Sequence, residues 1–161
     1  YSAIEPTPAF LSADIFGLTP WVDPSRDMGI GQRVDDIAPH TDYVSPMLYP
    51  TTFNRLALQP IGINDAWTAP YETVYYSMLQ MAKRTDTLVR PWLQHYALGV
   101  PYDRDDYLRQ RKAAEDAGSH GWLFWNSAAR YDTVVLGPDP YHLMRVIPQP
   151  PEPEPEAQEN P

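Results

Sequence analysis

Four short apolar segments are spaced along the chain and predict buried β-strands. They cover residues 10–17, 43–49, 88–96 and 121–126. Each is rich in aromatic or β-branched side chains, which favour the extended conformation. Strands that are covered on both faces tend to have this continuous apolar character. The pattern therefore predicts about four strands in the interior of a folded domain.

The clearest helix prediction lies between the second and third of these strands. Residues 70–84 begin with a proline, which is favoured in the first turn of a helix. Val74, Met78 and Met81 then recur about one turn apart, so they form a single apolar stripe. This spacing predicts an amphipathic helix with one buried side.

Two further helices are predicted between the remaining strands. Residues 104–117 are followed by Gly118, a common residue at helix C-termini. The apolar side of this helix is thin, because Arg111 interrupts it. A shorter helix at residues 32–38 ends at Pro39, which cannot continue it.

The predicted elements alternate as β-α-β-α-β-α-β, and the strands start about 33 to 45 residues apart. Right-handed crossovers of this kind produce either an open doubly wound sheet or part of a closed barrel. Gly29 and Gly31 lie deep in a loop, and no glycine fingerprint directly follows a strand, which disfavours a dinucleotide-binding domain. Every predicted strand ends in polar or aromatic residues, as in barrels whose active sites lie at the strand ends. We therefore expect an α/β fold with parallel strands.

Composition divides the chain into two parts. Hydrophobic residues make up 43% and aromatic residues 12% of the sequence, enough to build a core, and we expect one partial barrel domain at residues 1–147. Residues 148–161 alternate proline with glutamate and contain almost nothing that could be buried. We expect this tail to be disordered, because ordering it would cost conformational entropy without burying apolar surface.

Charge and residue usage exclude several classes of function. The net charge is −9 and no basic stripe is present, so we expect no nucleic-acid partner. No run of 18 apolar residues occurs, so we expect no membrane span. The chain has no cysteine, and its four histidines lie far apart, which makes a metal site improbable. No organic cofactor is expected either.

Asp14 is the best acidic candidate for catalysis. It lies inside an apolar strand, LSADIFG, where a carboxylate is unfavourable unless it faces a polar cavity or a partner. A structural role, with Asp14 paired to a lysine or arginine, is an equally good interpretation. The other aspartates of the following region lie in loops or on a short helix and are interpreted as solvated or capping residues; they are Asp23, Asp27, Asp35 and Asp36.

Strand ends supply further candidates for a sugar site. Tyr49 ends the second strand, where its hydroxyl could orient a sugar or stabilise developing positive charge, although a packed aromatic is the alternative. In the third strand, alternation puts Arg90, Trp92, Gln94 and Tyr96 on one polar and aromatic face, and Trp92 and Gln94 are the candidates selected from it. In the fourth, Trp125 and Asn126 stand near the strand end, where tryptophan could stack on a sugar or fill the core. A lone histidine such as the one at position 95 is more often structural.

Taken together, these segments resemble a known family. From about Leu11 to Tyr131 the chain closely resembles the bacterial "putative glycosyl hydrolase domain" family of the TIM-barrel glycosidase group. The segments that carry the resemblance are LSADIFGLTPWVDPSRDMGIGQRVDDIAPHTDYVSPMLYP, RPWLQHY and AAEDAGSHGWLFWNSAARY. The strand SPMLYP is similar to the Met-x-Tyr strand of chitinase-like enzymes, and GWLFWN to their closing tryptophan strand. The resemblance implies that Tyr49 and Trp125 line the sugar site.

The resemblance also implies that this chain is the C-terminal half of a (β/α)8 TIM barrel. In such families the main acidic motif ends the fourth strand, which would lie before Tyr1. The loop at residues 51–67 and Arg111 depart from the family pattern, so substrate contacts in that loop are not carried over. We expect half a barrel to have two unpaired edges and therefore to associate or be marginally stable, and to be inactive alone.

Two hypotheses for function follow. The first is hydrolysis of an O-glycosidic bond in a polysaccharide or cell-envelope glycan, with Asp14 and Tyr49 as catalytic residues and the missing N-terminal half as partner. The residues expected to bind substrate are Trp92, Gln94, Trp125 and Asn126. The second is a catalytically silent barrel that binds carbohydrate as a cell-envelope scaffold. The resemblance favours a location outside the cytoplasm or at the cell envelope.

Overall fold

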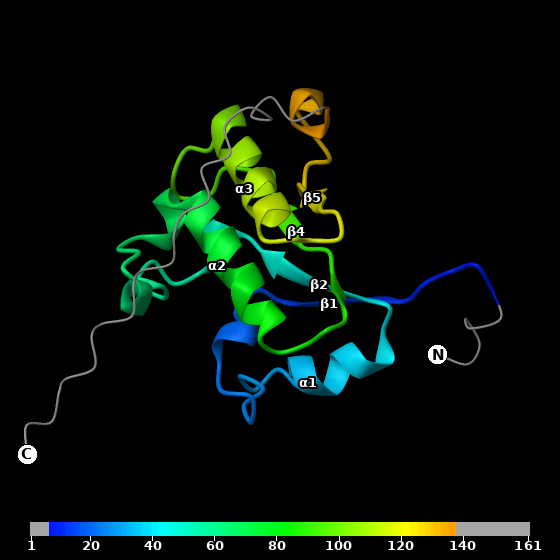
Figure 1. The fold of residues 1–161 in the computed structure, drawn as a ribbon. Coiled ribbons are helices and arrows are strands. Elements are labelled where there is room, and N and C mark those ends of the chain that lie inside the picture. The colour runs from blue at the N-terminus through cyan, green and yellow to red at the C-terminus, as the bar shows by residue number, and fades with distance from the viewer. Residues whose placement is uncertain (1–6, 138–161) are drawn as a thin grey trace, which may run out of the picture.

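The computed structural model describes residues 7–137, and Figure 1 shows their fold. The predicted boundary between domain and tail at residue 148 lies outside this range. Within it, five parallel strands and three α-helices follow one another as β-α-β-α-β-β-α-β, which confirms the predicted α/β class. Across residues 7–137, no helix has both the length and the apolar character needed to cross a membrane.

The sheet follows the order of the chain. β1 (Ser12–Phe16) pairs with β2 (Tyr43–Leu48), which pairs on its other side with β3 (Leu88–Val89) and β4 (Trp92–Gln94). β5 (Leu123–Trp125) then pairs with β4, and every pairing is parallel. Among the described strands, no pairing joins β5 to β1, so this sheet is open.

The predicted third strand is divided where the chain reaches Pro91. β3 and β4 pair with β2 in one continuous register, Tyr43 opposite Leu88 and Met47 opposite Trp92, so they continue one another along the same edge of β2. Proline has no N–H to donate to a neighbouring strand, which explains why the ladder is interrupted here.

The helices begin and end close to the predicted positions. α1 (Val34–Ile37) is a single turn that continues into the 3₁₀ turn Ala38–His40. α2 (Pro70–Ala82) has its proline in the first turn. α3 (Arg104–Asp116) starts with a capping box, in which the side chain of Asp103 accepts from the N–H of Asp106 and the side chain of Asp106 accepts from the N–H of Asp103.

One face of the sheet packs against the helices. α2 and α3 lie side by side (Figure 1), and their apolar stripes meet the sheet. The buried strand residues of this core are Ile15, Val44, Leu48, Val89, Leu93 and Phe124, and the helix residues are Val34, Val74, Met78, Met81, Leu108, Ala113 and Ala114. Burial of this set supplies the main hydrophobic stabilisation of the domain.

The other face of the sheet carries the alternate residues and is much less covered. Asp14 is exposed, Phe16 is 45% exposed and Trp125 is 40% exposed, while Met47 and Trp92 are half-buried. None of these five belongs to the core that includes the helices. We call this the bare face of the sheet. Such a one-sided arrangement follows from the strand order, because right-handed crossovers that always advance in one direction place every helix on the same side.

Arg111, which interrupts the apolar side of α3, is only 8% exposed, and its guanidinium makes several polar contacts. Its Nε donates to Glu115 Oε1 at 2.8 Å, and its Nη1 donates to the carbonyl oxygens of Val135 and Gly137. The guanidinium also lies over the ring of Trp122, 4.8 Å from its centroid. Arg111 therefore connects α3 to the 3₁₀ turn at residues 133–136.

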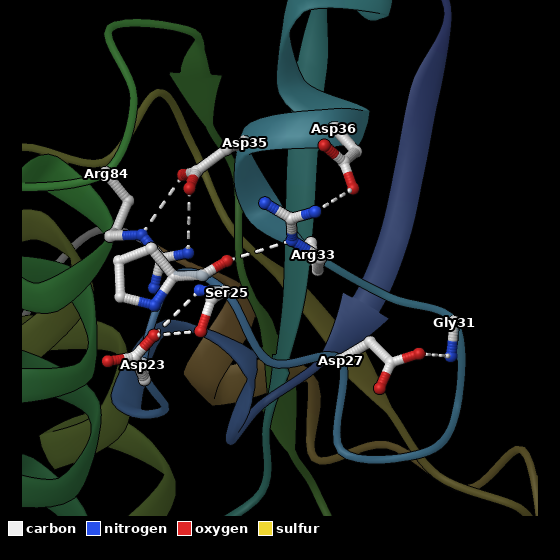
Figure 2. Close-up of polar contacts among 9 residues, drawn as sticks. Asp23, Ser25, Asp27, Gly31, Arg33, Asp35, Asp36 and Arg84 are labelled. Carbon is white, nitrogen blue, oxygen red and sulfur yellow. Dashed lines mark hydrogen bonds and ion pairs between the residues drawn. The ribbon is translucent and has the colours of Figure 1, made fainter.

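The loop that follows β1 is organised by carboxylates, as Figure 2 shows. Asp23 accepts from the N–H and the hydroxyl of Ser25, and these hydrogen bonds hold the pKa of Asp23 below its ordinary value. Asp27 accepts from the N–H groups of Gly29 and Gly31, and the bond from Gly29 has the largest effect in lowering the pKa of Asp27. These carboxylates stabilise the turn that they belong to.

Arg84 joins this loop to α1 and α2. Its Nε and Nη2 donate to the two carboxylate oxygens of Asp35 at 3.1 and 3.3 Å, and its Nη1 donates to the carbonyl of Val22 at 3.1 Å. Asp36 pairs instead with Arg33, at 3.2 Å (Figure 2). All four loop and helix aspartates thus have structural partners.

Replacing Arg84 with alanine should destabilise the fold. The Arg84 side chain is only 10% exposed, and its loss leaves Asp35 and the Val22 carbonyl without their donor. We expect the free energy of unfolding in urea to fall by roughly 1.5–3 kcal/mol, the usual contribution of hydrogen bonds to a charged group. Arg26→Ala, at an exposed position of the same loop, is the control and should change it by less than about 0.5 kcal/mol. Equal effects of the two variants would contradict this interpretation.

Candidate functional site

A pocket of about 270 Å³ opens on the bare face, at the C-terminal ends of the strands. Phe16 ends β1 and Trp125 ends β5. Tyr49 comes directly after β2, and Tyr96 lies in the segment that follows β4. The lining is completed by small and apolar groups: Gly17, Met47 and Thr52. Residues that are far apart in sequence therefore meet at one rim because parallel strands all end at the same edge.

Three aromatic rings form the wall of this pocket. Tyr49 stacks on Trp125 with centroids 5.8 Å apart and planes 25° apart. Tyr96 meets both rings edge-on, at 6.0 Å from Tyr49 and 5.5 Å from Trp125. Because each ring is fixed by two others, the exposed part of Trp125 is a rigid apolar surface.

Tyr49 stays neutral near pH 7. Its pKa is raised well above the ordinary value, first by burial and then by the neighbouring Tyr96 and Asp14. A neutral phenol can donate one hydrogen bond and accept others, but it is not a phenolate nucleophile. Its chemical capacity is therefore orientation and hydrogen bonding rather than covalent attack.

Asp14 lies on the bare face, two residues before Phe16 on β1, and thus deeper along the strand than the rim. Trp92 Nε1 donates to Asp14 Oδ1 at 2.9 Å across β2. Trp92 also lies opposite Met47 in the register of the sheet, and Met47 lines the pocket. Asp14, Tyr49, Trp92 and Trp125 therefore share one face of the sheet, and their roles in a sugar site stay predictions.

Gln94, two residues after Trp92 on β4, is fully buried. Its Oε1 accepts from the N–H of Thr51 at 3.1 Å and from the Thr51 hydroxyl at 2.9 Å. Its Nε2 donates to the carbonyl of Tyr96 at 2.8 Å, and its backbone exchanges hydrogen bonds with the side chain of Gln110. The carboxamide thus joins the loop after β2 to the loop after β4, and it positions Tyr96 rather than lining the pocket.

Asn126 closes the turn after β5. Its Nδ2 donates to the carbonyls of His95 and Arg130, and its Oδ1 accepts from the N–H of Ala128. Asn126 is not among the residues that line the pocket. A direct substrate contact by Asn126 or Gln94 stays a prediction from sequence, whereas the geometry gives both side chains a structural role.

His95 is a packed residue. It is 4% exposed, and its ring stacks on Tyr107 at 4.1 Å between centroids, with Phe124 and Tyr131 at its other sides. Its Nε2 accepts from the N–H of Asp132 at 3.2 Å, and burial lowers the pKa of the imidazole. An imidazole that is buried, packed between aromatic rings and accepting a hydrogen bond at Nε2 has a structural role.

Some pocket residues were not selected from the sequence. Tyr96 was placed on the same face as Trp92 but not in the site, and the alternation of the third strand is the signal that could have found it. Gly17 gives no such signal: a Cβ there would overlap the carbonyl oxygen of Met47, so β1 and β2 approach closely only because this residue is glycine.

Among residues 7–137, no group of three or more metal-binding side chains was found.

Replacing Gln94 with leucine distinguishes the two roles of this residue. Leucine has a similar size but leaves the Thr51 N–H and the Tyr96 carbonyl without partners in the interior, which should lower the free energy of unfolding by roughly 2–4 kcal/mol. The control is Gln59→Leu, at an exposed position in the loop after β2. It should change the free energy of unfolding, measured in the same urea titration, by less than about 0.5 kcal/mol. A stable Gln94→Leu variant that loses saccharide binding would instead show direct contact.

Comparison with known proteins gives a family but no individual relative. The model of the family described as a putative glycosyl hydrolase domain matches residues 1–131. No curated protein and no solved structure matches the chain.

Proposed function

The chain belongs to this glycosyl hydrolase domain family, and from that membership and the pocket geometry we propose that the bare face of the sheet forms part of a saccharide site in an O-glycosyl hydrolase. The observation that carries the proposal is the rigid aromatic wall at the strand ends, with Asp14 on the same face. Sugars present apolar C–H faces that pack on such rings, while their hydroxyls need a few polar partners nearby.

We further propose that the open sheet is half of a (β/α)8 barrel. Its strands advance in one direction without the reversal that doubly wound sheets have, and its bare face carries large side chains, including Phe16 and Trp125, that a barrel interior would enclose. The partner in this proposal is a further set of β/α units that would pair with the edges of β1 and β5.

Glycoside hydrolysis requires two carboxyl groups that flank the scissile bond, about 5–10 Å apart depending on the mechanism. Asp14 can supply one of them: the indole N–H of Trp92 orients its carboxylate, and Tyr49 lies within electrostatic reach. The second, acidic group would come from the completing strands. In this arrangement Tyr49 holds a sugar hydroxyl through its neutral phenol, and Trp125 supports the ring of the sugar.

A non-catalytic carbohydrate-binding barrel is the second candidate. The observation that favours it is that, among the strand residues of the bare face within residues 7–137, Asp14 is the only acidic one. A single carboxylate can bind and orient a sugar, but it cannot protonate the leaving group and activate the nucleophile in the same step. Binding without release of product would support this alternative.

Variants of the pocket test the proposed site. Trp125→Ala should weaken binding of cellohexaose or chitohexaose, measured by isothermal titration calorimetry, by about tenfold or more, because packing against an aromatic side chain contributes roughly 1.5–3 kcal/mol. Tyr49→Phe keeps the stacked ring and should weaken binding less. Phe10→Ala, at an exposed aromatic outside the pocket, is the control and should bind normally. Unchanged binding by Trp125→Ala would exclude this pocket as the saccharide site.

Catalysis is tested separately in the complete gene product. Asp14→Asn keeps an acceptor for the Trp92 indole and should therefore fold. A reducing-end assay should show turnover reduced by 100-fold or more (about 3 kcal/mol in the barrier) with binding weakened much less. Normal turnover in Asp14→Asn would remove this carboxylate from the mechanism.

A further inference from the structure

The pocket is built without any cationic side chain. Its seven lining residues are aromatic, aliphatic or small, and none of them is lysine, arginine or histidine. Asp14 and Arg90 are ionisable residues of the same face. The carboxylate of Asp14 lies one strand pleat below Phe16 and acts on the hydroxyl of Tyr49, which lines the pocket. Since neighbouring residues of one face are about 6.6 Å apart along a strand, this charge lies within reach of a molecule in the pocket.

Arginines elsewhere on the sheet and its loops are engaged away from the pocket. Arg90 lies between the rings of Phe10 and Tyr43, towards the N-terminal ends of the strands. In the loop after β2, Arg55 pairs with Asp65 at 2.6 Å and stacks on a tryptophan. Arg104 pairs with Asp132, and Arg130 is exposed in the turn after β5 and does not line the pocket.

The electrostatic environment of Tyr49 agrees with this distribution. Burial raises the pKa of its hydroxyl most, and among the groups that raise it further is the carboxylate of Asp14. A carboxylate near a phenol disfavours its anionic form and would disfavour any other anion in the same place. The faces of the aromatic rings add to this effect, because the π-system of an aromatic ring attracts cations and repels anions.

We propose that this pocket selects its saccharide by charge: it takes sugar units that are neutral or carry an ammonium group and rejects units that carry a carboxylate. This inference rests on the proposed saccharide site and specifies its substrate class. An amino sugar would gain from Asp14 and from the faces of Tyr49 and Trp125, while a uronic acid would meet the same groups without a counter-charge.

Three hexasaccharides that share the β-1,4-linked glucose backbone and differ in their charged substituent test the proposal. They are glucosamine hexamer (2-ammonium), cellohexaose (neutral) and glucuronic acid hexamer (C6 carboxylate), titrated calorimetrically into the complete gene product at mildly acidic pH and low salt. We expect affinity to decrease in that order. For a ligand charge about 6 Å from Asp14, Coulomb's law predicts roughly 3- to 100-fold between neighbouring members of the series, depending on the effective dielectric. The differences should shrink as salt is added.

Asp14→Asn identifies the source of the selectivity. This variant removes the charge and keeps the hydrogen bond from Trp92, so the three affinities should converge. Asp36→Asn removes one negative charge from the exposed end of α1 and should leave the order unchanged, which controls for the net charge of the protein. Convergence in both variants would attribute the effect to net charge and overturn the inference.

The two proposals fail in different ways. Tight binding of the glucuronic acid hexamer, equal to or stronger than that of cellohexaose, would overturn charge selection and leave the saccharide site intact. Absence of binding by all three hexamers, in a chain that unfolds cooperatively and is therefore folded, would overturn the saccharide site itself.

Discussion

The winding of the sheet in a single direction is the constraint on which the rest of this structure depends. Because each crossover is right-handed and advances to the next strand, every helix lies on the same side, and the alternate side chains of all the strands are left on the other. Side chains such as Asp14 and Trp92 can therefore meet across β2, although they are 78 positions apart in sequence. A sheet with a reversal in strand order would bury both faces under helices and separate these groups.

The second layer of organisation is polar and lies below the aromatic wall. The carboxamide of Gln94 uses both its oxygen and its nitrogen to hold the loops after β2 and β4, so Tyr96 has a fixed position relative to Tyr49. A buried amide with satisfied hydrogen bonds restricts the loops to one arrangement, since any other would leave polar atoms without partners in the interior. Rigid placement of the rings reduces the entropy that a ligand would otherwise lose on binding.

Much of the fold could be predicted from the chain, because helices and buried strands have periodic signatures that are local in sequence. The apolar stripe of α2 and the proline at its start defined that helix correctly. The division of the third strand at Pro91 follows from a missing N–H and could have been foreseen. For the site, the sequence placed Tyr49 and Trp125 at strand ends, and the structure stacks their rings on one another; their contact with a sugar stays a prediction. The roles of Gln94 and Asn126 could not be found in this way, since their partners are backbone groups of distant loops.

Arg111 shows that the folded unit extends beyond the region matched by the family. The matched region stops at residue 131, yet the guanidinium of Arg111 donates to carbonyl oxygens at positions 135 and 137. A protein shortened to the matched boundary would keep this buried cation and lose the backbone oxygens that replace its hydration, an arrangement that disfavours the native state. For expression and domain dissection, a protein that keeps this contact must therefore include at least the 3₁₀ turn at residues 133–136 and Gly137.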